Sequence, residues 1–516
     1  MTVPAAPATP PAPRPAPGLT PGSASAGSAS ASSPSAGSPP AILDTLFGAV
    51  WPESDLPGRP AIVARTVAVG ALAALVIPFR DLGSGTMLVL LAGGAATVAA
   101  VGRARWTPYL IGSLMLCTLL VMMVVVRDAA WISVLCVLAA AAVAVSAVVD
   151  ARSVLGLLVS ATAVPLAALR GLPWLGRSVR GTGRAASVMP MLRTAVISLV
   201  LMAVLGGLFA SADALFARWA GAVLPDLSLD TVGVRLLVLL VASGTTLATS
   251  YVALNPPAVE VFSRPARAVA RPFEWLVPVG LVLGVYIGFV AAQLTAMFGG
   301  HAYLESTTGL TYADYVHQGF GQLTVATLLT LGVVATAARK AQRGTGRDRL
   351  LVRLMLGALC LLTLTVVASA LFRMHVYEQA YGFTRLRVLV SVFEGWVGLV
   401  VVLVLVAGVR LEGRWLPRAA TAAGAAALLG LALVNPDGYV AQRNVERFAE
   451  TGKADWYYLA GLSADAVPAL EQLPPEAQAC VFGARVPRDD DWLEWNLGRV
   501  RAGETTLDAS EGCTTR

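Results

Sequence analysis

One stretch of the chain gathers ionisable side chains between two long apolar runs. Residues 375–388 read HVYEQAYGFTRLRV, and the next acidic residue, Glu394, lies within the apolar run that follows. Imidazole, carboxyl and guanidinium groups in such a place can bind a polar ligand, transfer a proton or neutralise one another. A carboxylate in apolar surroundings is costly unless it is paired or faces water. The stretch is therefore the first candidate for a functional site.

Two helices and a tight corner are expected to position these side chains. Gly382 is predicted to end the first helix in the left-handed conformation, and Thr384 is predicted to cap the second. Residues three or four apart share a helix face, so Arg387 and Glu394 are expected on one side of the second helix. At 1.5 Å per residue, Glu394 lies about 10 Å further along the axis.

Two interpretations of this corner remain open. In one, Arg385 and Arg387 neutralise Glu378 and Glu394 and lock the two helices together. In the other, the polar side chains line a cavity that opens to the outside, together with polar residues from SADALFA (211–217) and GLTYADYVHQGF (309–320), which are predicted on the same side. The candidate ligand-binding residues are then Asp213, Tyr312, Asp314, Tyr315, His375, Tyr377, Glu378, Tyr381, Arg385, Arg387 and Glu394.

The composition places the chain in a membrane. Only 13% of its 516 residues are charged, against about 25% in soluble domains, and 56% are hydrophobic. Apolar runs of about 20 residues recur along the chain, which predicts an all-α, polytopic bundle of transmembrane helices. The lipid bilayer is therefore an expected partner.

The number of membrane crossings depends on one segment. Residues 154–169 are short for a span and contain Pro165, so we interpret them as re-entrant or interfacial. This gives eleven crossings with the N-terminus inside; twelve crossings with the N-terminus outside is the alternative. The apolar segments are 61–79, 83–101, 107–126, 130–149, 154–169, 194–216, 233–254, 275–297, 320–338, 354–372, 387–409 and 416–434.

The distribution of basic residues predicts the orientation in a cell membrane. Segments 339–353 and 410–418 are rich in Arg and Lys, whereas 298–316 has neither. Short basic loops stay in the cytoplasm. The corner at 373–386 and the C-terminal segment 435–516 are therefore expected on the extracytoplasmic side.

Three regions are expected along the chain. Residues 1–58 begin with a Pro-, Ala- and Ser-rich stretch that is typical of a disordered tail, and residues 59–434 form the membrane domain. Residues 435–516 are predicted to form a small acidic, mainly helical extracytoplasmic domain. In that domain Asn435 is predicted to cap one helix and Asp490 another.

Several function classes are disfavoured. The net charge is +7, but residues 435–516 carry 14 acidic and 8 basic side chains, so the positive excess lies in the short loops of the membrane region and no nucleic-acid partner is expected. His301, His317 and His375 show no metal-ligand spacing, and no phosphate-binding or dinucleotide-binding loop occurs. We expect no metal and no cofactor, and the oligomeric state is not predicted.

The cysteines separate into two groups. Cys117, Cys136 and Cys360 lie within apolar runs, where packed and inert thiols are expected. Cys480 and Cys513 lie outside them. An extracytoplasmic location would favour a disulfide between these two, and two unpaired thiols are the alternative.

Four motifs carry a resemblance to a known family. SADALFA, GLTYADYVHQGF, VYEQAYGFTRLRV and NPDGYVAQRNVERF, the last continued by YLAGLSADAVPAL, resemble a bacterial multi-pass membrane family defined by domain of unknown function 4173, which is related to 4153. The resemblance covers about residues 194–470. It implies a membrane fold and no activity.

Three functions are compatible with the sequence. The first is a binding or transport protein with an outward-facing polar cavity for a small or lipid-linked ligand. The second is an outer-face enzyme acting on a lipid-linked substrate, with Glu378, Asp213 or Glu394 as acid or base. The third is an envelope scaffold or sensor whose C-terminal segment binds a partner.

Overall fold

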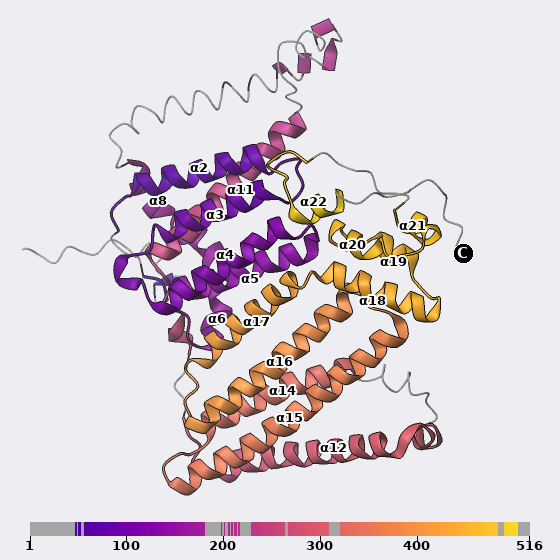
Figure 1. Cartoon of the computed structure of the whole chain (residues 1–516). Helices are drawn as coiled ribbons and strands as arrows, with labels where there is room; N and C mark the ends of the chain where they lie inside the picture. The colour runs from indigo at the N-terminus through magenta and orange to yellow at the C-terminus, as the bar shows by residue number, and fades with distance from the viewer. Residues whose placement is uncertain are drawn as a thin grey trace, which may run out of the picture. The chain divides into compact units, whose positions relative to one another are not determined.

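Helices account for the regular structure of the chain, which is described here by a computed structural model. The structure describes residues 47–48, 50–52, 56–180, 229–263, 267–308, 320–482 and 490–503, with isolated positions between 198 and 216. No strand occurs in these residues (Figure 1). The helices of the N-terminal half are α2 (Pro60–Val76), α3 (Ser84–Val98), α4 (Pro108–Val126), α5 (Ala130–Val149), α6 (Val154–Ser160), α7 (Ala163–Arg170), α8 (Leu172–Arg180) and α11 (Leu229–Leu254).

The second half continues with long helices and ends with short ones. The long helices are α12 (Phe273–Thr308), α14 (Phe320–Lys340), α15 (Gly346–Tyr381), α16 (Arg385–Arg410), α17 (Leu416–Leu433) and α18 (Pro436–Thr451). The short ones are α19 (Trp456–Ala460), η3 (Ala464–Ala466), α20 (Val467–Leu470), α21 (Pro475–Phe482) and α22 (Leu497–Gly503). We call α18 to α22 the tail helices.

The protein is an integral membrane protein. In the described residues eight helices are long and apolar enough to cross a membrane, namely α4, α5, α11, α12, α14, α15, α16 and α17, and α2 and α3 are shorter apolar helices. The prediction of an all-α polytopic bundle is confirmed. Most of the expected segment 194–216 lies outside the described residues, so the total number of crossings stays a prediction.

The segment 154–169 does not form one crossing helix. It divides into α6 and α7 at Ala161–Thr162, and each piece has at most eight residues. A crossing needs about 20 helical residues. The division therefore agrees with the re-entrant or interfacial interpretation.

The long helices pack in two groups that α17 connects. Helices α2, α3, α4, α5 and α11 pack together, and α12, α14, α15 and α16 form the second group. Helix α17 contacts α16 on one side and both α4 and α5 on the other, as Figure 1 shows. Large apolar side chains such as Leu281, Val285 and Leu329 remain exposed on the helices, as lipid contact requires.

The helix ends predicted from local sequence are found at two places, with one difference in backbone conformation. Gly382 ends α15 with φ +84° and ψ 168°, a positive φ but not the left-handed helical conformation that was predicted, and the Thr384 side chain accepts a hydrogen bond from the Arg387 N–H. The Asn435 side chain caps α18, which ends at Gly452 with φ +68°. These ends are set by neighbouring residues along the chain.

One capping prediction is wrong. The helix expected after Asp490 begins only at Leu497, where the Asn496 side chain accepts a hydrogen bond from the Gly498 N–H. Asp490 instead accepts a charge-assisted hydrogen bond from Arg499 at 2.6 Å. A cation further along the chain competes for the carboxylate more strongly than the backbone does.

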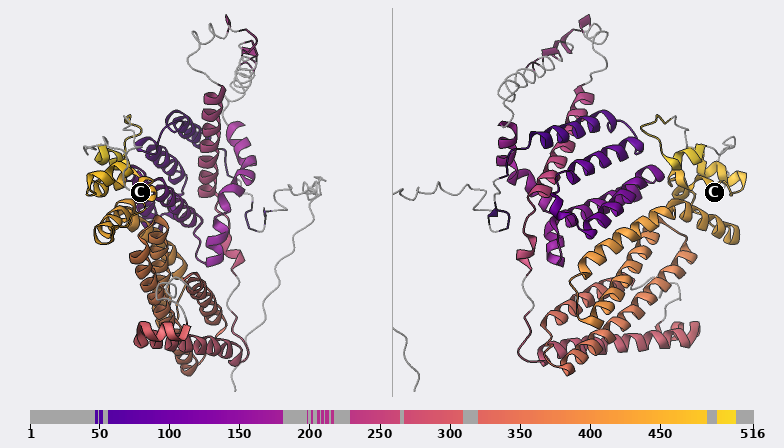
Figure 2. Two further views of the ribbon diagram at one scale, coloured as in Figure 1. Left: turned by 90° about the vertical axis from the view of Figure 1, so that its right-hand side faces the viewer. Right: turned by 60° about the vertical axis from the view of Figure 1, so that its left-hand side comes forward.

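The tail helices belong to the same compact unit as the membrane helices, which begins at Phe47. Helix α18 contacts α16, and α22 contacts α4. Figure 2 shows the tail helices beside the adjoining ends of α4, α5, α15 and α16. Many of the polar contacts of the described residues gather at this junction.

Candidate functional site

The corner between α15 and α16 is held by the tail. The Asn444 amide on α18 accepts a hydrogen bond from the Phe383 N–H at 3.1 Å and donates one to the Phe383 carbonyl at 2.9 Å. A side chain at Gly382 would approach the Asn444 oxygen to 2.7 Å. Glycine is thus required there both by the positive φ and by the close approach of α18.

Arg385 pairs with a carboxylate of the tail. Its Nε and Nη2 atoms donate to the two oxygens of Asp437 at 2.8 Å and 2.5 Å. Asp437 is completely buried and also accepts hydrogen bonds from the Trp131 indole and the Ser463 N–H. Burial acts to raise the pKa of Asp437, but the hydrogen bonds from Arg385 and Ser463 outweigh it, so the pKa lies below its usual value.

Arg387 forms no ion pair in the described structure. Its guanidinium lies 4.4 Å from the centre of the Tyr377 ring and donates to the carbonyls of Tyr381 and Gly382. The Tyr377 and Tyr381 rings lie 4.8 Å apart. Arg387 therefore stabilises the end of α15 by cation–π contact and by binding its last carbonyls.

The two acidic residues near the α15–α16 corner, Glu378 and Glu394, are both buried, and no cation forms an ion pair with either of them in the described residues. Glu378 lies beside the Ser391 hydroxyl and near the charge of Arg387. Glu394 accepts one hydrogen bond, from Thr324 of α14 at 3.0 Å. The interpretation in which Arg385 and Arg387 neutralise these carboxylates does not match this geometry.

The remaining predicted site residues are peripheral or outside the description. His375 is exposed and pairs with Gln379 one turn along α15 at 3.0 Å. Asp213 is exposed, and its carboxylate accepts hydrogen bonds from the N–H groups of Leu215 and Phe216. Tyr312, Asp314 and Tyr315 lie outside the described residues, so their role stays a prediction.

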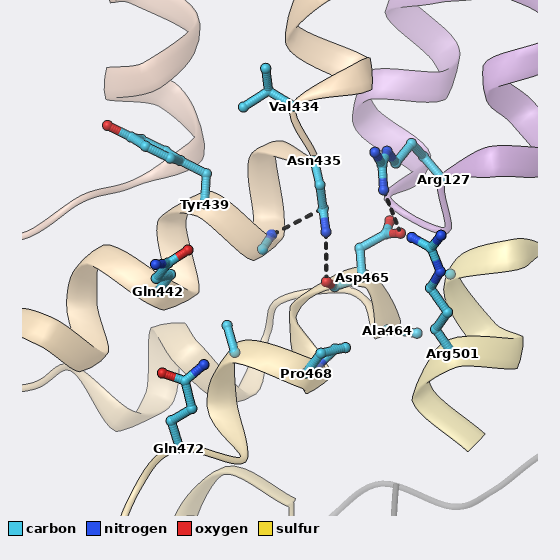
Figure 3. Close-up of a pocket in the computed structure, with 13 residues that line it drawn as sticks. Arg127, Val434, Asn435, Tyr439, Gln442, Ala464, Asp465, Pro468, Gln472 and Arg501 are labelled. Atoms are coloured by element: carbon cyan, nitrogen blue, oxygen red, sulfur yellow. Dashed lines mark hydrogen bonds and ion pairs between the residues drawn. The ribbon is translucent and has the colours of Figure 1, made fainter. Parts of the chain in front are cut away.

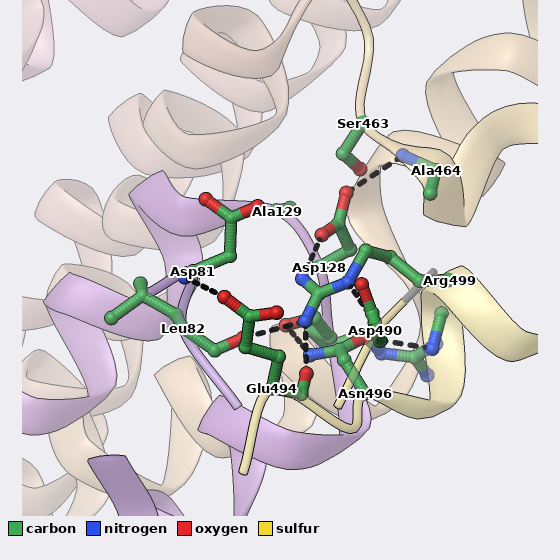
Figure 4. A network of polar contacts seen from close by, with 12 residues as sticks. Asp81, Leu82, Asp128, Ala129, Ser463, Ala464, Asp490, Glu494, Asn496 and Arg499 are labelled. Carbon is green, nitrogen blue, oxygen red and sulfur yellow. Dashed lines mark hydrogen bonds and ion pairs between the residues drawn. The ribbon is translucent and has the colours of Figure 1, made fainter. Parts of the chain in front are cut away.

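The sequence reasoning missed a polar network between the tail and the α4–α5 corner, which Figure 4 shows. Arg499 of α22 donates to Asp128 at 2.7 Å and to Asp490 at 2.6 Å. The other Asp128 oxygen accepts a hydrogen bond from the Ala464 N–H at 2.9 Å. In the sequence, the charged pair Arg127 and Asp128 stands between two apolar runs in VVVRDAAW, and this was the signal that could have indicated the network.

Asp465 caps a membrane helix from outside that helix. Its Oδ2 atom accepts hydrogen bonds from the N–H groups of Asp128 and Ala129 at 2.7 Å and 2.9 Å, at the start of α5. A carboxylate there complements the positive end of the helix dipole. Burial raises the pKa of Asp465, although the Ala129 N–H and the charge of Arg127 act in the opposite direction.

Arg127 caps the C-terminal end of α17, also from outside that helix. Its guanidinium donates to the carbonyls of Ala432 and Leu433 at 2.6 Å and 2.7 Å, and it lies 3.8 Å from Asp465. Burial lowers the pKa of Arg127, while Asp465 acts to raise it. Its donors are thus largely used within the protein.

A cavity of about 510 Å³ lies beside this contact. We call it the junction cavity. Figure 3 shows Arg127, Asp465 and Arg501 on one side of it, and Gln442 and Gln472 on the other. Its lining comes from the α4–α5 corner, α18, the η3–α20 turn and α22, namely Arg127, Val434, Asn435, Gly438, Tyr439, Gln442, Ala464, Asp465, Pro468, Ala469, Gln472, Gly498 and Arg501.

The lining of the junction cavity includes none of the candidate ligand-binding residues that were predicted from the sequence. It carries two guanidinium groups and one carboxylate, with amides and a phenol around them. No cluster of three or more metal-binding side chains occurs in the described part of the chain. The arrangement suits the binding of a polar molecule.

The cysteines follow their expected grouping as far as they are described. Cys117, Cys136 and Cys360 are free thiols in α4, α5 and α15. Cys480 on α21 takes part in a disulfide. Cys513 lies outside the described residues, so its pairing with Cys480 stays a prediction.

Comparison with known proteins identifies a family. Residues 114–473 match the model of the family described as Domain of unknown function (DUF4153). The match begins further toward the N-terminus than the resemblance in the sequence motifs, and it covers more than half of the chain. No curated protein and no solved structure matches the chain.

Proposed function

Since the chain belongs to the DUF4153 family, which is defined by a domain of unknown function, we propose that it is a membrane-embedded binding protein whose ligand occupies the junction cavity. The observation that carries this proposal is the cavity itself, a volume of about 510 Å³ lined by polar groups from four parts of the chain. Such a volume is within the range of small-molecule sites.

The charges in the cavity favour an anionic ligand. Arg127 is buried and already donates to two carbonyls. Arg501 is exposed, has no ion pair in the described residues, and faces the same space. A guanidinium in this position can bind a carboxylate or a phosphate through two parallel hydrogen bonds. A small anion and the headgroup of a lipid-linked molecule share this chemistry.

The geometry gives less support to the rival functions. An acid–base enzyme needs a carboxyl group that can exchange a proton with its substrate, whereas the Oδ2 atom of Asp465 is held by two backbone hydrogen bonds and its Oδ1 atom lies 3.8 Å from the Arg127 guanidinium, which fixes this carboxylate as part of the protein's own structure. A transporter site lies near the middle of the membrane, between helices. The junction cavity lies instead at the helix ends, where a binding protein can capture a ligand from water.

The proposal places the cavity on the extracytoplasmic face of the cell membrane. A cysteine in place of Tyr457, whose side chain is 93% exposed, should react with a membrane-impermeant thiol reagent in intact cells lacking Cys480 and Cys513. A cysteine in place of Arg347, an exposed residue in the first turn of α15, should react only after lysis. The reverse pattern would overturn the orientation.

The ligand itself can be sought among molecules that copurify with the protein. After purification from its own membranes, the denatured protein should release an anionic molecule that mass spectrometry identifies. Arg501→Glu should lose this molecule, because it places a like charge against it. Arg349→Glu, at an exposed position on the opposite end of α15, is the charge-matched control and should retain it. An identical set of molecules from all three proteins would contradict the proposal.

A further inference from the structure

A second feature, independent of the junction cavity, lies inside the membrane domain. Glu394 on α16 is 0% exposed. Its Oε2 atom accepts a hydrogen bond from the Thr324 hydroxyl at 3.0 Å, and its Oε1 atom has no hydrogen-bond partner. An ionised carboxylate accepts several hydrogen bonds and is costly to bury with fewer. The protein thus holds an acidic group where a negative charge is poorly accommodated.

Glu394 lies too far from the end of α16 for bulk water to solvate its carboxyl group. It lies nine residues after Arg385, the first residue of the helix, which corresponds to about 14 Å of helix length. Helix α16 is one of the candidate spans, and the hydrocarbon core is about 30 Å thick. Glu394 is therefore well inside the apolar part of the bundle.

The groups that face Glu394 from the neighbouring helices include no paired cation. Helix α14 supplies Thr324, and the charged residues at the other end of α14 are Arg339 and Lys340. Helix α15 carries two buried charged residues in this half, Arg373 and Glu378, and neither forms a hydrogen bond with Glu394, whose Oε1 atom has no partner. Arg418, the only charge on α17, pairs with Asp150, and Asp437 on α18 pairs with Arg385. No cation neutralises the Glu394 carboxyl within the described part of the bundle.

Two polar residues lie between Glu394 and the end of the bundle. Ser391 precedes it by three residues and so lies on the same face of α16. The Ser391 hydroxyl lies beside Glu378. Glu378 is 7% exposed and lies in the last turn of α15, close to the Gly382 corner. Carboxyl and hydroxyl groups in such a series are the elements of proton relays in membrane proteins.

We propose that Glu394 is a proton-binding site of the membrane domain, with Ser391 and Glu378 as its route to water at the α15–α16 corner. The Glu394 carboxylate accepts a proton and becomes a neutral acid, whose O–H can then donate a hydrogen bond. A sodium or calcium ion would need several oxygen ligands around it. Glu394 has only the Thr324 hydroxyl as a hydrogen-bonding partner here, and this favours the proton.

A hydrophobic carbodiimide provides the test, because this reagent reacts with protonated carboxyls in apolar surroundings. Membranes containing the full chain are treated with dicyclohexylcarbodiimide from pH 5 to pH 9, and adducts are located by peptide mass spectrometry. The peptide with Glu394 should carry the adduct, and labelling should fall about tenfold for each pH unit once the carboxyl ionises. Exposed Glu412, just beyond the far end of α16, should remain unlabelled.

Two variants separate proton binding from mere reactivity. Thr324→Val removes the donor that stabilises the ionised form, so labelling of Glu394 should persist to higher pH. Glu394→Gln, which keeps the shape, should abolish the adduct and also remove the carboxylic acid stretching band from the infrared spectrum. Absence of the adduct at every pH, labelling that does not change with pH, or an unchanged infrared spectrum in Glu394→Gln would each overturn the proposal.

Discussion

Asp437 at the tail junction and Glu394 in the membrane bundle are both completely buried carboxylates with opposite surroundings. Asp437 accepts four hydrogen bonds, from Arg385, Trp131 and the Ser463 N–H. Glu394 accepts one, from Thr324. Burial alone therefore does not reveal the role of an acidic residue, and the supply of donors distinguishes a structural carboxylate from one suited to bind a proton.

The location of each residue explains the difference. At the junction, helix ends and turns leave backbone N–H groups without helical partners, and Ser463 offers one of these to Asp437. Inside the bundle every backbone N–H of a helix is already used, so only side chains can donate. Regions between helices can thus supply a buried carboxylate with several hydrogen-bond donors, whereas the interior of the bundle cannot.

The largest effect is expected when the junction carboxylate is removed. Asp437→Ala leaves Arg385 without its partner. Breaking a fully buried ion pair costs on the order of 3–5 kcal/mol of unfolding free energy, and this is the upper limit here because the Arg385 side chain is 32% exposed. Thermal unfolding in detergent and limited proteolysis of the tail would measure the loss. Glu446→Ala removes an exposed pair with Arg443 and should cost at most about 1 kcal/mol. Equal effects of the two changes would refute the structural role of Asp437.

The disulfide of the tail is expected to have the next largest effect. A bridge from Cys480 to Cys513 closes a loop of roughly 34 residues, which corresponds to about 3–4 kcal/mol in the chain-entropy model. Thiol counting on denatured protein should give three free thiols before reduction, since Cys117, Cys136 and Cys360 are free, and five afterwards. A count of five before reduction would exclude the bridge.

Acid should loosen the junction. The pKa of Asp437 is lowered in the folded protein, so its contribution to the stability of the folded state is fully present above the ordinary pKa of 3.8 and is lost as the pH falls through the folded pKa. The pKa of Asp465 is raised, so its contribution to stability declines as the pH rises above 3.8. Near that pH the two carboxyl groups therefore act in opposite directions. Proteolysis of the tail should therefore accelerate below about pH 4. Asp437→Asn should remove much of this dependence, and a profile unchanged in that variant would assign it to other groups.

The smallest effect is expected at Glu394. Glu394→Gln keeps the shape and can still accept the hydrogen bond from Thr324, so folded yield and thermal stability should change by less than about 1 kcal/mol. A loss as large as that of Asp437→Ala would mean that Glu394 is ionised and paired. The contrast between the two sites would then disappear.

Predictions that rested on neighbouring residues were mostly correct at the α15–α16 corner and at the start of α18. Thr384 and Asn435 cap their helices as predicted, whereas Gly382 ends α15 with a positive φ but without the left-handed helical conformation. The family resemblance and the all-α membrane fold are also confirmed. The prediction for Asp490 was wrong because Arg499, which lies 9 residues further along the chain in α22, supplied a stronger, charged partner.

By itself the sequence determined that this is a membrane protein of apolar helices, where several of these helices end, and which stretch carries ionisable groups, because hydropathy and capping depend on residues close together in the chain. Only the tertiary structure decided the partners of those groups. Arg385 meets Asp437 from 52 residues away, and Asp465 caps a helix 336 residues before it. Such pairs depend on how whole helices pack, and local sequence does not contain that information.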